Sequence, residues 1–209
     1  MSNCAFCSKH KYCKFEDGMH LTDCPTVNER DMVKTSQEEY LQSPYSDFML
    51  RSLRQVAAGY EAMDNKPHPI KTRLEEIIDF CHRMGYQKLG LAFCTGLEDD
   101  AKVMAKVLRK NGFEVISPVC KVGGLEKEEV GLEDAGKIIP GRREISCNPL
   151  LQAELMNKAG TDFNIVFGLC LGHDSLFLKA SNAMCTVFVV KDRVLHHNPI
   201  AALDAYREL

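Results

Sequence analysis

Short apolar runs alternate with helix-forming segments over the second half of the chain, from Tyr86 onward. Four runs are apolar enough to be buried strands: KLGLAFC (88–94), FEVISPVC (113–120), FNIVFGLC (163–170) and MCTVFVVK (184–191). Helical segments fill the intervals, over residues 98–111, 149–158, 174–181 and 199–208. Apolar strands that alternate with helices indicate a parallel sheet covered on both faces. The sequence therefore predicts an α/β protein, a three-layer Rossmann-like domain with about four parallel strands.

Two further helices are expected before this sheet, over residues 46–63 and from about 69 to 84, because apolar residues recur there at helical spacing. The N-terminal stretch is different: it is rich in Lys, His and Cys and has no helical or strand periodicity. We therefore expect a cysteine-rich segment over residues 1–28 and a Rossmann-like domain with N-terminal helices over residues 29–209.

The charge and hydropathy of the chain exclude several classes of partner. The chain has 26 Lys and Arg residues against 29 Asp and Glu, a net charge of −3, and no basic block. A nucleic-acid partner would need a positive face, so we expect none. No apolar run approaches the roughly 20 residues that span a bilayer, and the N-terminal residues lack the apolar core of a secretory signal. We expect a cytoplasmic protein without membrane attachment, in which clustered cysteines are ligands or catalysts rather than disulfides.

Four of the ten cysteines form a local group in the cysteine-rich segment, spaced C-x2-C-x5-C-x10-C-P: Cys4, Cys7, Cys13 and Cys24. A C-x2-C turn presents two thiolates to one ion, and two further cysteines complete a tetrahedral set. The same four ligands suit a [4Fe–4S] cluster, and a proline after the last cysteine also occurs in ferredoxin-type runs. The spacing predicts a metal site for zinc or a [4Fe–4S] cluster and does not choose between them. His10 and His20 are alternative ligands.

A second group of cysteines is dispersed in the sequence but meets at one edge of the predicted sheet. Cys94 and Cys170 end predicted strands, and Cys147 precedes a helix that feeds the third strand. His173 follows Cys170 at C-x2-H spacing. In open α/β sheets, ligands bind beyond the carboxyl ends of the strands. We therefore predict that these four residues line a second metal, cluster or cofactor site, with Cys120, His196 and His197 as weaker candidates.

Thiol chemistry without a metal is the main alternative. Cys147-Asn-Pro and His197-Asn-Pro share a signature, in which Asn caps a helix and Pro is its first residue. A thiol beside a helix N-terminus is more easily ionised. Cys147 or Cys170 could then act as a nucleophile, with a histidine as its base. The long Gly-rich connection over residues 121–146 is expected to be either a functional lid over this edge or a disordered segment.

The ordered set CAFC…CP, LAFCTGL, CKVGG, CNPLLQAEL, GLCLGHDSLF and VVKDRVLHHNP resembles an uncharacterised family of cysteine-rich prokaryotic proteins. The likeness extends nearly from end to end. It implies metal binding, and, because the family is typical of anaerobes, it favours an iron–sulfur cluster. The residues at the motif positions are Cys4, Cys7, Cys13, Cys24, Cys94, Cys147, Cys170 and His173.

Three functions follow as hypotheses. The first is a metal-binding protein with an N-terminal four-cysteine site and a second cysteine-lined site at the sheet edge. The second is a thiol-based or redox enzyme that acts on a small molecule. The third is a metal-trafficking or interaction module, which would need no substrate pocket. Neither the reaction nor the oligomeric state follows from the sequence.

Overall fold

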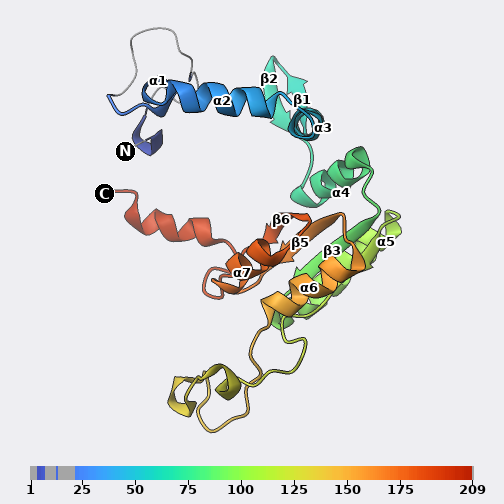
Figure 1. Ribbon diagram of the computed structural model, residues 1–209, viewed down its shortest axis with the longest axis vertical. Coiled ribbons are helices and arrows are strands. Elements are labelled where there is room, and N and C mark those ends of the chain that lie inside the picture. Colours follow the sequence, from blue (N-terminus) through green and yellow to red (C-terminus); the bar gives the residue numbers. More distant parts are fainter. Residues whose placement is uncertain (1–3, 8–12, 14–21, 209) are drawn as a thin grey trace. The chain divides into compact units, whose positions relative to one another are not determined.

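The computed structural model describes residues 4–7, 13 and 22–208 (Figure 1). The chain divides into two compact units, Met1–Ala57 and Ala58–Leu209. The predicted division at residue 28 stays a prediction, and His10 and His20 lie outside the described residues. Within the described part of the chain, no helix combines the length and the apolar character needed to cross a bilayer.

The described part of the first unit is helical. Its elements are η1 (Cys4–Phe6), α1 (Pro25–Asn28), α2 (Arg30–Tyr40) and α3 (Tyr45–Ala58). The sequence did not predict α2, because its residues RDMVKTSQEEY are mostly polar and none of them is buried. The segment therefore has too few apolar residues at helical spacing for the helix to be recognised from the sequence. Helix α3 was predicted from residue 46, close to where it begins.

An antiparallel hairpin replaces the predicted end of the helix over 46–63 and the predicted beginning of the next. Strand β1 (Tyr60–Met63) pairs with β2 (Lys66–Pro69) across a two-residue turn. Both turn residues, Asp64 and Asn65, have positive φ, of 50° and 58°. Asp and Asn tolerate this conformation, which tight hairpin turns require. Helix α4 (Arg73–Met84) then begins after Thr72, which forms a capping box with Glu75.

The second unit is built on a parallel sheet of four strands, as predicted (Figure 1). The strand order, which the sequence did not indicate, is β4-β3-β5-β6. The strands are β3 (Lys88–Phe93), β4 (Glu114–Ile116), β5 (Phe163–Phe167) and β6 (Met184–Val189). The helices that follow them are α5 (Glu98–Lys110), α6 (Pro149–Ala159), α7 (His173–Ala180) and the 3-10 helix η6 (Pro199–Tyr206). Strand β4 is shorter than the predicted 113–120: beyond it, only Val119 forms a bridge, with Phe93.

Two cores cover opposite faces of the sheet, because successive side chains of a strand point to opposite sides. Leu91 of β3 and Ile165 of β5 pack with α4 and α5 in one core. Ala92 and Val166, the next residues in each strand, pack with α6 and α7 in the other. Strand β5 is buried along its whole length. The unit is therefore a helix–sheet–helix sandwich, and the predicted Rossmann-like layout is confirmed.

Candidate functional site: a cysteine-lined pocket at the carboxyl edge of the sheet

The order of the strands reverses between β3 and β5. The chain runs from β3 outward to β4 and then returns to β5 on the other side of β3. In open α/β sheets the carboxyl ends of the strands at such a reversal flank a crevice. Cys94 directly follows β3, and Cys170 comes three residues after the end of β5. The topology thus places these two thiols at the point of the sheet where ligands bind in this class of fold.

Backbone hydrogen bonds tie the loops of this edge together. The N–H of Cys94 donates to the carbonyl of Phe167 at 3.2 Å, and the N–H of Cys120 donates to that of Phe93 at 2.9 Å. The N–H of Asn148 donates to the Cys120 carbonyl at 2.7 Å. These bonds hold Cys94, Cys120 and Asn148, the cap residue of α6, side by side. They explain how cysteines that are distant in the sequence lie close together in the fold.

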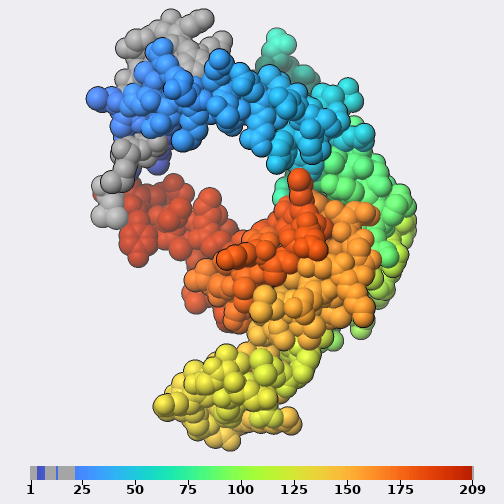
Figure 2. All heavy atoms as spheres, viewed as in Figure 1, coloured from blue at the N-terminus to red at the C-terminus, as the bar shows by residue number. Residues whose placement is uncertain are grey.

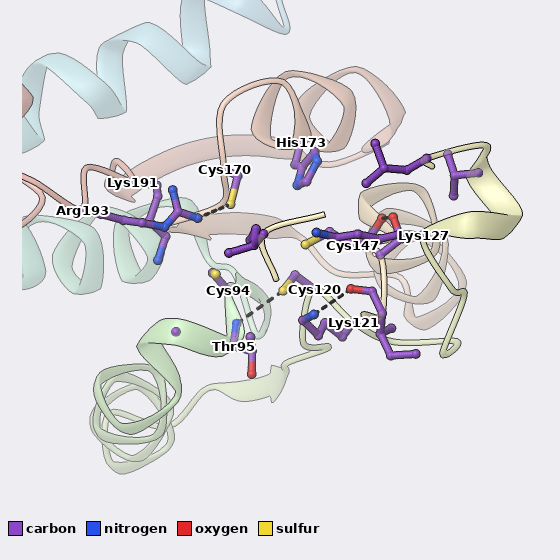
Figure 3. A pocket seen from close by; sticks show the side chains of 16 residues that line it. Cys94, Thr95, Cys120, Lys121, Lys127, Cys147, Cys170, His173, Lys191 and Arg193 are labelled. Atoms are coloured by element: carbon purple, nitrogen blue, oxygen red, sulfur yellow. Dashed lines mark hydrogen bonds between the residues drawn. The ribbon is translucent and has the colours of Figure 1, made fainter. Parts of the chain in front are cut away.

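A pocket of about 490 Å³ opens at this edge, and four cysteines line it: Cys94, Cys120, Cys147 and Cys170 (Figure 3). Its other lining residues include five basic side chains: Lys121, Lys127, His173, Lys191 and Arg193. Apolar side chains form part of its wall: Val130, Leu132, Ile138 and Ile145. All four residues that the sequence predicted for a site at this edge line the pocket: Cys94, Cys147, Cys170 and His173. Cys120, which was a weaker candidate, lines it as well.

Three of the four thiols influence one another's ionisation. The interaction of Cys94 with the thiol of Cys120, together with burial, raises the pKa of Cys94 to about 12. The interaction of Cys120 with Cys147 raises the pKa of Cys120. The same interaction lowers the pKa of Cys147 despite partial burial. Of these three thiols, Cys147 is therefore the most readily ionised.

The fourth thiol has a cationic partner. Nη2 of Arg193 donates to Sγ of Cys170 at 3.1 Å, and this contact raises the pKa of the guanidinium (Figure 3). The backbone N–H of Thr95 donates to Cys120 at 3.4 Å. Positive and donor groups therefore surround the sulfur atoms.

His173 contributes an unused hydrogen-bonding group. It is the first residue of α7, held by a bond of 3.0 Å from its own N–H to the Cys170 carbonyl. The side-chain atom Nδ1 is buried and has no hydrogen-bond partner among the described residues. A buried imidazole nitrogen without a partner is costly, and such groups often mark functional sites. His196 and His197 do not line the pocket; Nδ1 of His197 instead accepts from the N–H of Asp192 at 3.1 Å.

The Gly-rich connection 121–146, here called the lobe, is ordered by ion pairs rather than by a core. The side chain of Lys137 is only 5% exposed and pairs with Glu128 and Asp134. Lys127 pairs with Glu144, which also accepts from the N–H of Ile139 at 2.8 Å. The lobe carries all four of the apolar pocket residues named above. The lobe therefore lies beside the thiols, and its functional role stays a prediction.

The four N-terminal cysteines lie in the first unit. Cys4 begins η1 and its carbonyl accepts from the N–H of Cys7 at 3.0 Å, whereas Cys24 is the cap residue before α1. Across the described ranges, no group of three or more His, Cys, Asp and Glu side chains is arranged to hold a metal ion as they stand. The zinc or [4Fe–4S] site predicted for Cys4, Cys7, Cys13 and Cys24 therefore stays a prediction.

Sequence reasoning missed the cations of the pocket. Lys191 and Arg193 follow β6 in the run VVKDRV, and Lys121 and Lys127 belong to the lobe. Their positions at strand ends could have indicated the same edge that the cysteines share. They were overlooked because isolated basic residues after a strand are usually solvated, and only the folded loops show where these side chains converge.

Comparison with known proteins identifies relatives of unknown function. The model of a family described as "Protein of unknown function (DUF1847)" matches residues 24–188, a range that contains the four pocket cysteines. The uncharacterized protein MJ0455 of Methanocaldococcus jannaschii is 55% identical over 133 residues, which cover 64% of this chain and 67% of that protein. No solved structure matches the chain.

Proposed function

We propose, starting from the finding that the chain belongs to the DUF1847 family of unknown function, that the pocket binds a thiophilic metal ion or an iron–sulfur cluster. The ligands in this proposal are Cys94, Cys120, Cys147 and Cys170. One observation carries it: four thiols from three separate connections, those after β3, β4 and β5, line a single pocket at the reversal point of the sheet. The described lining residues include no Asp or Glu. A soft, sulfur-only donor set favours zinc, Cu(I) or an iron–sulfur cluster over hard cations.

The donor set fits such a centre chemically, although the thiols must close in around it. Each cysteine can swing its sulfur by rotation about a single side-chain bond. A bound zinc ion with an open position would supply Lewis acidity, and a cluster would supply one-electron transfer. His173 Nδ1, buried and without a described partner, could serve as a further donor beside the four thiols.

The ionisation of the thiols would proceed in a set order. Among Cys94, Cys120 and Cys147, only Cys147 has a lowered pKa, so it should be the first of the three to become a ligand. Cys94, with a pKa of about 12, should be the last, when a metal competes with its proton for the sulfur. The accumulating negative charge is offset by the cationic side chains around the sulfurs.

Metal content of matched cysteine variants tests this proposal. Protein purified without oxygen is analysed for metal and acid-labile sulfide, as the natural sequence and as Cys94→Ser, Cys170→Ser and Cys185→Ser. Cys185 lies in β6, outside the pocket, and is the control. We expect each pocket variant to lose one metal or cluster equivalent while far-UV circular dichroism stays unchanged, and the control to lose none. Unchanged metal content in both pocket variants would reject the proposal.

A second site through Cys4, Cys7, Cys13 and Cys24 is proposed on the spacing of these residues alone. Cys7→Ser should then remove a different equivalent from the one removed by Cys170→Ser. A double variant that loses no more metal than either single variant would show that one centre, not two, is bound.

Thiol chemistry at Cys147 is the second candidate, supported by the lowered pKa of that thiol. Cys147 lines a pocket large enough for a small molecule, since ligand sites typically enclose about 300–1,000 Å³. This pocket also counts against a pure metal-trafficking module, which would need none. Under the thiol hypothesis, Cys147 is the fastest-alkylating thiol in protein that carries no metal, and Cys147→Ser abolishes that reactivity.

A further inference from the structure

The pocket has a charge opposite to that of the whole chain. The chain carries a net charge of −3, yet the described residues that line the pocket include four Lys and Arg side chains and no carboxylate. A cleft with charges of one sign concentrates its field and attracts ligands of the opposite sign. The charge pattern therefore favours a negatively charged organic ligand in the part of the pocket beside the thiols.

Two of these four cations are already used by the lobe. Nζ of Lys121 donates to the carbonyl of Ile145 at 2.7 Å, and Lys127 pairs with Glu144. The other two, Lys191 and Arg193, lie on the opposite side of the pocket and reach toward Cys94 and Cys170 (Figure 3). An anionic ligand could therefore interact with these two side chains.

Lys191 has an uncommitted ammonium group. No hydrogen bond or ion pair joins it to any described residue, although its charge acts on Cys94. A Cβ atom placed on Gly96 would lie 3.6 Å from Nζ of Lys191 and 3.9 Å from Sγ of Cys94. Gly96 therefore lies within van der Waals reach of both the ammonium group and the thiol, and a side chain longer than that of alanine at this position would occupy space beside them.

The turn after β6 aims both cations at this space. The carboxylate of Asp192 accepts from the N–H groups of Val194 and Leu195, at 3.0 Å and 2.9 Å, so it is turned into the backbone. The acid between the two cations therefore does not neutralise them within the pocket. Arg193 uses one Nη2 donor on Cys170, and a guanidinium has five N–H donors in all.

The opposite wall of the pocket is apolar. Val130, Leu132 and Ile138 of the lobe line it, and in Figure 3 the lobe lies across the pocket from Lys191 and Arg193. Ile138 is 82% exposed and Val130 62% exposed, so their surface is available to a ligand. A bound molecule would then meet positive charge at one end and apolar side chains at the other.

We propose that the pocket binds a small organic anion, with its anionic group between Lys191 and Arg193 beside the thiols and its apolar part against the lobe. This inference goes beyond the proposed metal function and does not depend on it, because neither Lys191 nor the lobe supplies a metal ligand. It assigns the ligand a chemical class: a carboxylate or comparable anion with a short apolar body. A metal centre in the pocket would then have an anionic ligand or substrate next to it.

Calorimetric titration with a matched pair of probes tests the inference. Hexanoate and hexanamide have the same apolar body and differ in charge. The full-length protein, as purified, should bind hexanoate at least about tenfold more tightly than hexanamide, which is the scale of a charge-assisted hydrogen bond. Lys191→Gln should remove this preference and Lys191→Arg should restore most of it. Lys179→Gln, on an exposed position of α7 outside the pocket, is the control and should leave it unchanged.

Three results would overturn the inference: no saturable binding of hexanoate, equal affinity for the two probes, or a preference that survives Lys191→Gln. Metal analysis of the same samples separates this test from that of the proposed function. Lys191→Gln should keep its metal while losing the preference for hexanoate. Natural protein that selects hexanoate but contains no metal would refute the metal proposal and leave the anion site standing.

Discussion

Asn148 and Asn198 offer a matched test of how the fold positions Cys147. Both precede a proline at the start of a helix, in the shared signature Asn-Pro. The side chain of Asn148 accepts from the N–H of Leu151 at 3.0 Å and so caps α6, whereas Asn198 makes no side-chain cap bond to η6. Identical local sequences thus have different roles.

The structure sets the size of the expected effect. Asn148→Ala removes the cap and leaves the N–H of Leu151, at a half-buried helix start, without its acceptor. Loss of an N-cap side chain costs about 0.5–2 kcal/mol, typically ~1. For a chain of this size that corresponds to a fall in melting temperature of roughly 2–4 °C. Asn198→Ala has no cap bond to lose, so its effect should stay within about ±0.5 kcal/mol, as at ordinary surface positions.

Urea unfolding followed by far-UV circular dichroism measures both variants against the natural protein. The free-energy change is taken from the shift in midpoint at a common slope. Because Cys147 is next to the cap, Asn148→Ala should also change the reaction rate of that thiol. Equal destabilisation by the two substitutions, or an Asn148→Ala variant as stable as the natural protein, would refute the assignment of the cap.

Three further predictions concern the site and the loops that hold it. Gly168→Ala should destabilise the protein by about 2–5 kcal/mol, because φ is +65° and the new Cβ would lie 2.2 Å from Cδ1 of Leu97. Gly85→Ala is the control: φ is +76° but the space is open, so the same unfolding assay should show only the backbone strain of about 1–2 kcal/mol. In metal-free protein, the alkylation rate of Cys147 should reach its plateau at a lower pH than that of Cys94, because the pKa of Cys147 is lowered and that of Cys94 is about 12. Mass spectrometry of each alkylated site checks the order, and faster reaction of Cys94 at neutral pH would contradict it. Lys137→Met should accelerate amide hydrogen exchange across the lobe at neutral pH without changing exchange in β5, and a lobe exchanging at its natural rate would show that these ion pairs do not order it.

The ion pairs of the lobe also have a definite pH dependence. Lys137 lowers the pKa of both Glu128 and Asp134. A group with a lowered pKa in the folded state contributes stability above its ordinary pKa and loses it as the pH falls through the folded value. The lobe should therefore be fully held at neutral pH and loosen in acid, below the ordinary carboxyl range. Salt should also weaken these pairs, because both carboxylates are exposed to solvent even though Lys137 is not.

The sheet could be predicted from the sequence because its signals are local. Strand β5 is apolar except for Asn164, and a strand buried on both faces is typically a nearly continuous apolar run. The positions of Cys94, Cys147 and Cys170 then follow from topology, since carboxyl ends of parallel strands share an edge. The same reasoning found His173 through its spacing from Cys170.

The hairpin and the cations could not be found in this way. Tyr60 and Met63 continue the apolar spacing of α3, so a helix pattern covered residues that pair as a strand. The positive φ of Asp64 and Asn65 makes this segment a hairpin rather than a continued helix, and it is a property of the folded turn. Lys191 and Arg193 belong to the pocket only because the Asp192 turn redirects them. No local pattern marks that redirection.

The central claim, a metal centre held by the pocket thiols, is tested most directly by X-ray absorption at the metal edge. The sample is full-length protein in which Cys4→Ser and Cys7→Ser remove the N-terminal ligands, so that the pocket supplies the signal. The account predicts a bound metal with a coordination shell of sulfur, at about 2.3 Å if the metal is zinc. A protein without bound metal, or a metal surrounded by oxygen and nitrogen alone, would contradict it.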